Sequence, residues 1–314
     1  MRAAQYDRYG PPDVLHEAEA SVPVPGEGEV LVKVHGTSVN ALELGLRSGR
    51  FRIATGMRFP KGMGMDFAGE VAGVGEKVTT FGVGDRVWGF LGGLPGGRTA
   101  AGAEFVLAKA GKISSAPTSI PLLEAGALPM AGATALIALR DHCKVKPGQR
   151  VLIRGASGGV GVSAVLLAKA MGAHVTALAG PGNLDFVRQL GADAALDYHT
   201  HGPDQLGRFN AIVDLTGSRM LTYRKLLAPH GRMVTTVIDR VFAIIPSAIY
   251  GPKRIRTFSA SPNAQLFADL AAAVDRGELR PIIDTVRPLC EMAAAHAALE
   301  AGGGRGKQLV RVLS

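Results

Sequence analysis

Residues 151–161 read Val-Leu-Ile-Arg-Gly-Ala-Ser-Gly-Gly-Val-Gly. An apolar strand is followed here by a glycine turn, and the turn opens a helix of small and aliphatic residues. This order is typical of a pyrophosphate site, because free amide hydrogens and the helix dipole at a helix N-terminus attract an anion. Gly158 lets the main chain approach the phosphates, and Gly161 lets the helix pack on the strand. The turn therefore predicts a bound dinucleotide, held by Ala156, Ser157, Gly158, Gly159, Val160 and Gly161.

The turn lies in a segment where short apolar strands alternate with helices. One helix is expected from about residue 160 to 171, and another near 184–190. Fully apolar strands that alternate with helices indicate a parallel sheet covered on both faces. The chain after Pro121 is thus expected to form a doubly wound α/β domain. Its expected strands are 151–153, 174–178, 194–198, 211–214 and 233–237.

The rest of the chain has a different pattern of expected strands and helices. Before about residue 120, Pro and Gly separate short β-like runs at the intervals of an antiparallel barrel. The C-terminal part has two expected helices, 263–276 and about 290–301, and a closing strand, 308–312, that needs a sheet to join. The β-like runs of the first third are 29–34, 70–75, 85–90 and 103–107.

The second strand of the expected α/β domain ends without an acid. A domain that selects NAD places Asp or Glu there, about 20 residues beyond the fingerprint, to bind the ribose 2′-hydroxyl. This chain has Gly180 instead, in a neutral turn that runs from Ala179 to Asn183. A neutral turn does not repel a 2′-phosphate. Gly180 and Asn183 are therefore expected to line a site for NADPH.

Composition excludes several classes of protein. Hydrophobic residues make up 47% of the 314 residues and charged ones 19%, which is too little charge for a disordered chain. Lys and Arg number 35 against 26 Asp and Glu, and the resulting net charge of +9 favours an anionic partner. Only 5% of residues are aromatic, so the stacking surfaces of nucleic-acid-binding proteins are scarce. No uncharged run reaches the ~20 residues that span a bilayer.

Metal and nucleophile motifs are missing from the sequence. Cys143 and Cys290 have no CxxC spacing, so we expect a reducing, cytoplasmic compartment and no structural zinc. Loops 37–41 and 64–69 contain neither Cys nor His. No G-x-S-x-G elbow and no P-loop lysine occurs. Hydride transfer without a metal remains a possible reaction for this chain, because a reduced nicotinamide carries the reactive electrons and the protein only has to orient the reactants.

Motifs of a known family follow one another along nearly the whole chain. They are Val14-Leu15, Pro23-Val24-Pro25, 29–32, Ser38-Val39-Asn40, 64–71, 84–87, Leu128-Pro129, Thr134-Ala135, the glycine turn, 190–193, Asp197-Tyr198, 214–217 and Gly306-Lys307. In these motifs the chain resembles the zinc-free quinone oxidoreductases of the medium-chain dehydrogenase/reductase superfamily, which include the zeta-crystallins. The resemblance implies an α/β protein with a GroES-like β-barrel catalytic domain and a Rossmann NADP-binding domain. The implied limits are 1–120 for the barrel, 121–256 for the Rossmann domain and 257–314 for a return to the barrel.

The resemblance also implies site residues. Asn40 would lie near the nicotinamide ribose with Glu43 close by, and these two are the expected catalytic residues. Each has a structural alternative, Asn40 as the cap of a helix that starts at Ala41 and Glu43 as a first-turn carboxylate that complements the helix dipole. Tyr198 would flank the adenosine 2′-phosphate, or would be a half-buried strand end. The further implied cofactor contacts are Thr134, Thr216, Val237 and Ser259.

We therefore expect a zinc-independent, NADPH-dependent reductase that transfers hydride to a quinone or an α,β-unsaturated carbonyl compound in an interdomain cleft. One alternative is an enoyl-thioester reductase, in which Lys253, Arg254 and Arg256 hold a phosphate arm. An alternative of another class is a non-catalytic protein that binds NADPH or nucleic acid. The resemblance implies a homodimer, and neither a membrane segment nor a nucleic-acid partner is expected.

Overall fold

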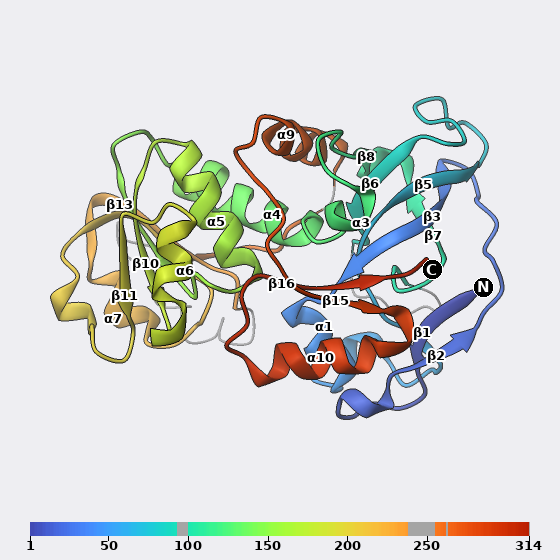
Figure 1. The fold of residues 1–314 in the computed structure, drawn as a ribbon, viewed down its shortest axis with the longest axis horizontal. Helices are drawn as coiled ribbons and strands as arrows, with labels where there is room; N and C mark the ends of the chain where they lie inside the picture. The colour runs from blue at the N-terminus through green and yellow to red at the C-terminus, as the bar shows by residue number, and fades with distance from the viewer. Residues whose placement is uncertain (93–99, 238–254, 262, 314) are drawn as a thin grey trace. The chain divides into compact units, whose positions relative to one another are not determined.

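The computed structural model describes residues 1–92, 100–237, 255–261 and 263–313, and it divides into two compact units (Figure 1). Unit 1 comprises Met1–Ala131, Ser261–Gly277 and Pro281–Ser314. Unit 2 comprises Gly132–Ala260 and Glu278–Arg280. The domain limits expected from the sequence, after residues 120 and 256, stay predictions.

Unit 1 is built on a sheet that has seven strands in the described residues. β15 and β16 run parallel, and the other described pairs of this sheet are antiparallel. The path is β15 (Ile283–Pro288), β16 (Lys307–Arg311), β3 (Glu29–Ser38), β5 (Asp66–Val74), β6 (Arg86–Phe90) and β8 (Ser114–Ser115), with β7 (Phe105–Lys109) paired to β3. A smaller sheet has the order β2 (His16–Glu19), β1 (Arg2–Tyr6) and β4 (Lys61–Gly62).

The core of unit 1 follows from alternation along its strands. Val30, Val32 and Val34 of β3 are fully buried, because every second side chain of a strand points to the same face. Trp88 of β6 is also fully buried, and its indole N–H donates to Ser114 Oγ at 3.1 Å. The helices of this unit are α1 (Ala41–Arg47), α2 (Arg52–Thr55), α3 (Leu122–Ala125), α9 (Ala264–Asp275) and α10 (Met292–Ala301). The helix α4 (Pro129–Leu136) begins in unit 1 and ends in unit 2.

The C-terminal segment joins the sheet of unit 1. β16 pairs antiparallel with β3, with Leu309 opposite Ser38, so the prediction that the closing strand joins a sheet is confirmed. Asn263 caps α9 through a hydrogen bond from Leu266 N to Oδ1 at 2.8 Å, which fixes the start of the helix expected at 263–276. β15 was not predicted, because its residues alternate between half-buried and exposed and give no apolar run.

Unit 2 is a parallel sheet with helices. The sheet order is β11 (Ala194–Asp197), β10 (His174–Ala179), β9 (Arg150–Arg154), β12 (Phe209–Asp214), β13 (Leu227–Thr235) and β14 (Ile255–Thr257). All described pairs are parallel, which confirms the doubly wound α/β prediction. Val151, Leu152 and Ile153 of the central β9 are fully buried, as an apolar strand of such a sheet requires. The α-helices that follow these strands are α5 (Gly159–Ala170), α6 (Leu184–Gln189) and α7 (Met220–Arg224).

Among the described helices, none has both the length and the apolar composition needed to cross a bilayer. The cytoplasmic location and the homodimer expected from the sequence stay predictions.

Candidate functional site

The glycine turn of unit 2 has the shape that a diphosphate site needs. β9 ends at Arg154, Gly155 has a φ of 79°, and Gly158 is the N-cap of α5. A Cβ on Gly161 would lie 2.1 Å from the carbonyl oxygen of Gly155, so only glycine allows this helix to approach the turn. A Cβ on Gly158 would meet only that same oxygen, at 3.6 Å, which leaves the surface over the first turn open. The first amides of α5 have no partner within the helix, so they can donate to an anion.

Three further predicted residues, Asn183, Gly180 and Tyr198, lie near this turn. Asn183 is buried and donates from Nδ2 to Ser157 Oγ at 3.3 Å, which links the turn to the 3-10 helix η4 (Pro181–Asn183). A Cβ on Gly180 would lie 3.7 Å from the ring of Tyr198. Tyr198 is 54% exposed, its ring packs on His199, and it directly follows the end of β11. The carboxyl ends of β10 and β11 therefore present a phenol beside a neutral turn.

The loops after β12 and β13 complete this edge of the sheet. Thr216 Cγ2 would lie 3.3 Å from a Cβ on Gly155, and Val237 Cγ1 would lie 2.7 Å from a Cβ on Gly217. Both predicted residues thus border glycines at the carboxyl ends of the strands, where α/β sheets bind their ligands. Thr134 is buried within α4, and Ser259 is exposed beyond the end of β14.

A buried ion pair that the sequence reading missed fixes the same edge. Arg154 Nη1 donates to Asp214 Oδ1 at 2.8 Å and to Ser218 O at 2.7 Å. Asp214 Oδ1 also accepts from the main chain of Thr216 and Gly217, at 3.1 and 3.2 Å. The signal in the sequence was a single Arg at the end of an apolar strand, directly before the glycine turn. This pair holds the loop after β12 against the turn.

Asn40 lies at the centre of a buried polar cluster in unit 1. It occupies the N-cap position of α1, but its side chain makes no capping hydrogen bond, so the capping alternative is wrong. Its Nδ2 donates to Asp66 Oδ2 at 2.9 Å and to Glu43 Oε1 at 3.1 Å. Its Oδ1 accepts from Lys307 Nζ at 2.6 Å. These partners fix the orientation of the amide.

Asp66 and Lys307 tie distant segments to this cluster. Asp66 accepts from Ser38 Oγ at 2.6 Å and from the main chain of Met130 at 2.7 Å. Lys307 Nζ lies 3.5 Å from Asp66 Oδ2 and donates to Val39 O at 2.9 Å. Both side chains are almost fully buried, so the interior charge of Asp66 is compensated by Lys307 and by hydrogen bonds.

Glu43 is fully buried in the same cluster. Burial is the main cause that raises the pKa of Glu43 to about 8. The nearby charge of Asp66 acts in the same direction, and the hydrogen bond from Asn40 acts against it. Its Oε1 accepts from the main chain of Met65 at 3.1 Å, whereas its Oε2 has no hydrogen-bond partner in the described residues. Glu43 does lie in the first turn of α1, as the helix-dipole alternative requires. With a pKa of about 8 its carboxyl is mainly protonated at neutral pH, so it contributes little charge to that dipole.

His296 of α10 faces the free oxygen of Glu43. The distance from His296 Nε2 to Glu43 Oε2 is 3.8 Å, which is too long for a direct hydrogen bond. Burial, together with the charge of Arg47, lowers the pKa of His296 to about 3. Since both groups are neutral at pH 7, this contact is not an ion pair.

Arg47 connects the buried cluster to Glu300 at the surface of unit 1. This side chain is fully buried and donates from Nη2 to Glu300, which is partly exposed. Nε and Nη1 of Arg47, like both ring nitrogens of His296, have no hydrogen-bond partner in the described residues. Buried polar atoms are normally satisfied by protein or by internal water. This side of Glu43 therefore has the composition of a hydrated interior site.

The described residues contain no group of three or more His, Cys, Asp or Glu side chains that could hold a metal ion. Lys253 and Arg254, expected to hold a phosphate arm, lie outside the described residues, and Arg256 is exposed on β14.

Two family models match the chain. The model described as alcohol dehydrogenase GroES-like domain matches residues 26–118, and the one described as zinc-binding dehydrogenase matches residues 190–310. The chain is similar to the chloroplastic quinone-oxidoreductase QR1 of Triphysaria versicolor, with 33% identity over 99% of this chain and 98% of that protein. It is also similar to the mitochondrial NAD(P)H oxidoreductase RTN4IP1 of Homo sapiens, with 30% identity over 100% of this chain and 89% of that protein.

A solved structure agrees with these relatives. The quinone oxidoreductase from Coxiella burnetii superposes with a TM-score of 0.91 at 32% identity, over 100% of this chain and 99% of that one. The fold therefore has a GroES-like part and a Rossmann part, as the sequence predicted. The chain belongs to the quinone oxidoreductase family of the medium-chain dehydrogenase/reductase superfamily.

Proposed function

We propose that the protein is an NADPH-dependent oxidoreductase that reduces a quinone or an α,β-unsaturated carbonyl compound. The observation that carries the proposal is the carboxyl edge of the sheet in unit 2. There the open first turn of α5, the Asn183–Ser157 hydrogen bond and the neutral turn beside Tyr198 lie together. These groups suit a diphosphate followed by a 2′-phosphorylated ribose. NADPH, when bound, supplies the hydride.

We propose that the chain holds this cofactor mainly through its main chain. The first amides of α5 donate to the diphosphate, and Ser157 and Asn183 fix the turn that presents them. Gly180 leaves room for the 2′-phosphate beside the Tyr198 hydroxyl. Thr216 and Val237 form the continuation of the site along the edge of the sheet, and Thr134 and Ser259 remain proposed contacts.

In unit 1, we propose that Glu43 supplies the proton that a reduced quinone or enone requires. Glu43 keeps its proton at neutral pH because it is buried, and Asn40 orients it through the hydrogen bond to Oε1. The acidic proton then lies on Oε2, the oxygen that faces the neutral ring of His296 at 3.8 Å.

The function is tested by measuring consumption of NADPH and of NADH, over a panel of quinones, enones and enoyl thioesters. We expect NADPH to be consumed faster than NADH, with quinones or enones as acceptors. Faster turnover of enoyl thioesters would favour the alternative substrate class. No oxidation with any acceptor, together with salt-dependent binding of single-stranded nucleic acid, would contradict an oxidoreductase.

The role of Glu43 has a separate test. Glu43→Gln keeps the acceptor for Asn40 and removes the proton donor, so kcat should fall about 100-fold while the KM for NADPH is unchanged. Infrared difference spectra of the wild type against this variant at pH 7 should contain the C=O band of a protonated carboxyl. A carboxylate signal alone would contradict the proposal, whatever the activity.

A further inference from the structure

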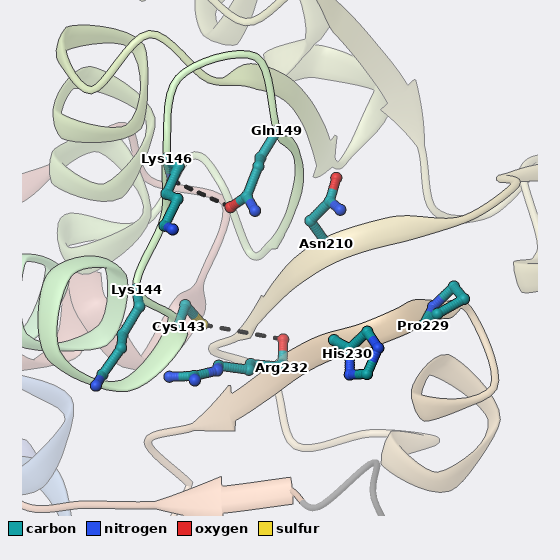
Figure 2. A pocket seen from close by; sticks show the side chains of 8 residues that line it. All are labelled: Cys143, Lys144, Lys146, Gln149, Asn210, Pro229, His230 and Arg232. Atoms are coloured by element: carbon teal, nitrogen blue, oxygen red, sulfur yellow. Dashed lines mark hydrogen bonds between the residues drawn. The ribbon is translucent and has the colours of Figure 1, made fainter.

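A pocket in unit 2 lies at the edge of the sheet opposite the glycine turn. Its volume is about 240 Å³, and Figure 2 shows the side chains that line it. Gln149 directly precedes β9, and Asn210 lies in the first part of β12. The glycine turn follows the last residue of β9, so in a parallel sheet the two places are separated by the length of the strands. The lining residues are Cys143, Lys144, Lys146, Gln149, Asn210, Pro229, His230 and Arg232.

The charged groups of this pocket are all basic. Lys144, Lys146 and Arg232 line it together with His230, and no carboxylate is among the described lining residues. Arg232 donates one hydrogen bond, from Nη1 to His142 O at 3.2 Å, and the described residues show no ion pair for it or for the two lysines. Like charges held together raise the local positive potential and attract an anion.

The two amides of the pocket are also oriented as donors. Gln149 Oε1 accepts from the main chain of Lys146 at 3.0 Å. Asn210 Oδ1 accepts from the main chain of Arg150 at 2.9 Å. With both oxygens engaged by the main chain, the NH₂ groups remain to donate to a ligand. The polar side chains at this place therefore offer mainly N–H donors, which is the pattern expected for an oxyanion site.

The backbone of the pocket is held in an uncommon conformation. Lys144 has a φ of 52° and His230 a φ of 62°, both in the left-handed region that favours glycine. Only four described residues other than glycine have a positive φ, and two of them line this one pocket. Such conformations cost about 1–3 kcal/mol each and are concentrated at functional sites.

A further positive charge, that of Arg256, lies close to the pocket residue Cys143. Burial raises the pKa of Cys143 to about 12, although the charges of Arg232 and Arg256 act to lower it. Arg256 also contributes, after burial, to lowering the pKa of His142. The guanidinium of Arg256 is thus close enough to add its positive charge to that of the pocket.

We propose that this pocket is a second anion site, separate from the dinucleotide site, which binds a small phosphate-bearing molecule or phosphate itself. The lysines and Arg232 supply the charge, and Gln149 and Asn210 supply directed hydrogen bonds. The volume accommodates a phosphate group with a small organic part and is too small for a whole dinucleotide.

The test uses a substitution that changes one donor and preserves the fold. Gln149→Glu keeps the oxygen that accepts from Lys146 N, and it replaces the donating NH₂ by a negatively charged oxygen. Gln205→Glu is the matched control, because Gln205 Oε1 accepts from Gly202 N three residues earlier in the same way and does not line the pocket. Both variants change the net charge of unit 2 equally.

Inorganic phosphate and pyrophosphate are titrated into the full chain by calorimetry, at constant ionic strength. We expect saturable binding to the wild type and to Gln205→Glu, and an affinity at least about tenfold lower for Gln149→Glu. Equal affinities for the three proteins would overturn the proposal by placing the anion elsewhere, for example at the glycine turn. The absence of saturable binding to the wild type would also overturn it. Neither result depends on whether the protein is an oxidoreductase.

Discussion

The two units bring polar groups together in opposite ways. The carboxyl edge of the sheet in unit 2 is made mainly of main-chain amides and small side chains. Its buried ion pair Arg154–Asp214 is tied to the loop by hydrogen bonds to Asp214 Oδ1, and Asp214 Oδ2 has no partner in the described residues. The cluster of unit 1 is made of side chains, and Glu43, His296 and Arg47 keep buried polar atoms without partners in the described residues. The first arrangement suits a fixed anion site, whereas the second suits groups that hold or pass a proton.

The largest effect is expected from Gly161→Val in unit 2. Its Cβ would lie 2.1 Å from Gly155 O, and a main-chain oxygen cannot move aside without distorting the turn. We expect the free energy of unfolding to fall by about 3 kcal/mol in urea titrations, and NADPH binding to be lost. Gly182→Val is the control, since a Cβ there would meet no atom within 4 Å. Equal urea midpoints for the two variants would show that the turn is not closely packed.

Lys307→Met probes the side-chain cluster of unit 1. It removes the donor to Asn40 Oδ1 and Val39 O and leaves the buried carboxylate of Asp66 without its cation. We expect a loss of about 3 kcal/mol in the free energy of unfolding. Lys169→Met removes an exposed pair with Asp193 and should cost at most about 1 kcal/mol. Similar losses for the two variants would contradict a buried, compensated charge.

The pH dependence of stability distinguishes the neutral Glu43–His296 pair from a true ion pair. Glu43 has a folded pKa of about 8 against an ordinary 4.5, so the folded state binds its proton more tightly and stability falls as pH rises between these values. His296 has a folded pKa of about 3 against 6.5, so its contribution rises with pH up to 6.5 and opposes that of Glu43. Above pH 6.5 the fall due to Glu43 exceeds the remaining rise due to His296.

We therefore expect the urea-derived free energy of unfolding to drop by about 1 kcal/mol between pH 6.5 and 8. Glu43→Gln should abolish this drop, and Glu17→Gln, at an exposed position on β2, should retain it. Stability that rises through the same interval would mean that Glu43 is ionised in the folded protein.

The smallest effect is expected at Tyr198, which is exposed at the edge of unit 2. Tyr198→Ala removes a ring beside Gly180 and a hydroxyl suited to a 2′-phosphate. We expect the affinity for NADPH to fall about fivefold, which corresponds to about 1 kcal/mol. The affinity for NADH serves as the control and should stay within twofold, roughly the error of such titrations. Parallel losses for both cofactors would assign Tyr198 to the adenine instead.

The two regions also differ in what the sequence could predict. The glycine turn, the parallel strands and the neutral turn at Gly180 are contiguous patterns, so their local order carries the prediction. The distant partners of Asn40 and Glu43 were not predicted, because Lys307 and His296 lie more than two hundred residues away along the chain. β16 brings Lys307 to the end of β3 only after the sheet has formed. A lone Arg, Lys or His in a sequence does not reveal its buried partner.

The central claim is that a dinucleotide diphosphate lies against the amides at the start of α5. Hydrogen exchange of the peptide that spans Gly155 to Val162, with and without NADPH, tests it most directly. We predict that NADPH slows the exchange of the amides from Ser157 to Gly161, and that the Gly161→Val variant shows no such protection. Unchanged exchange of this peptide at an NADPH concentration that saturates binding would contradict the account.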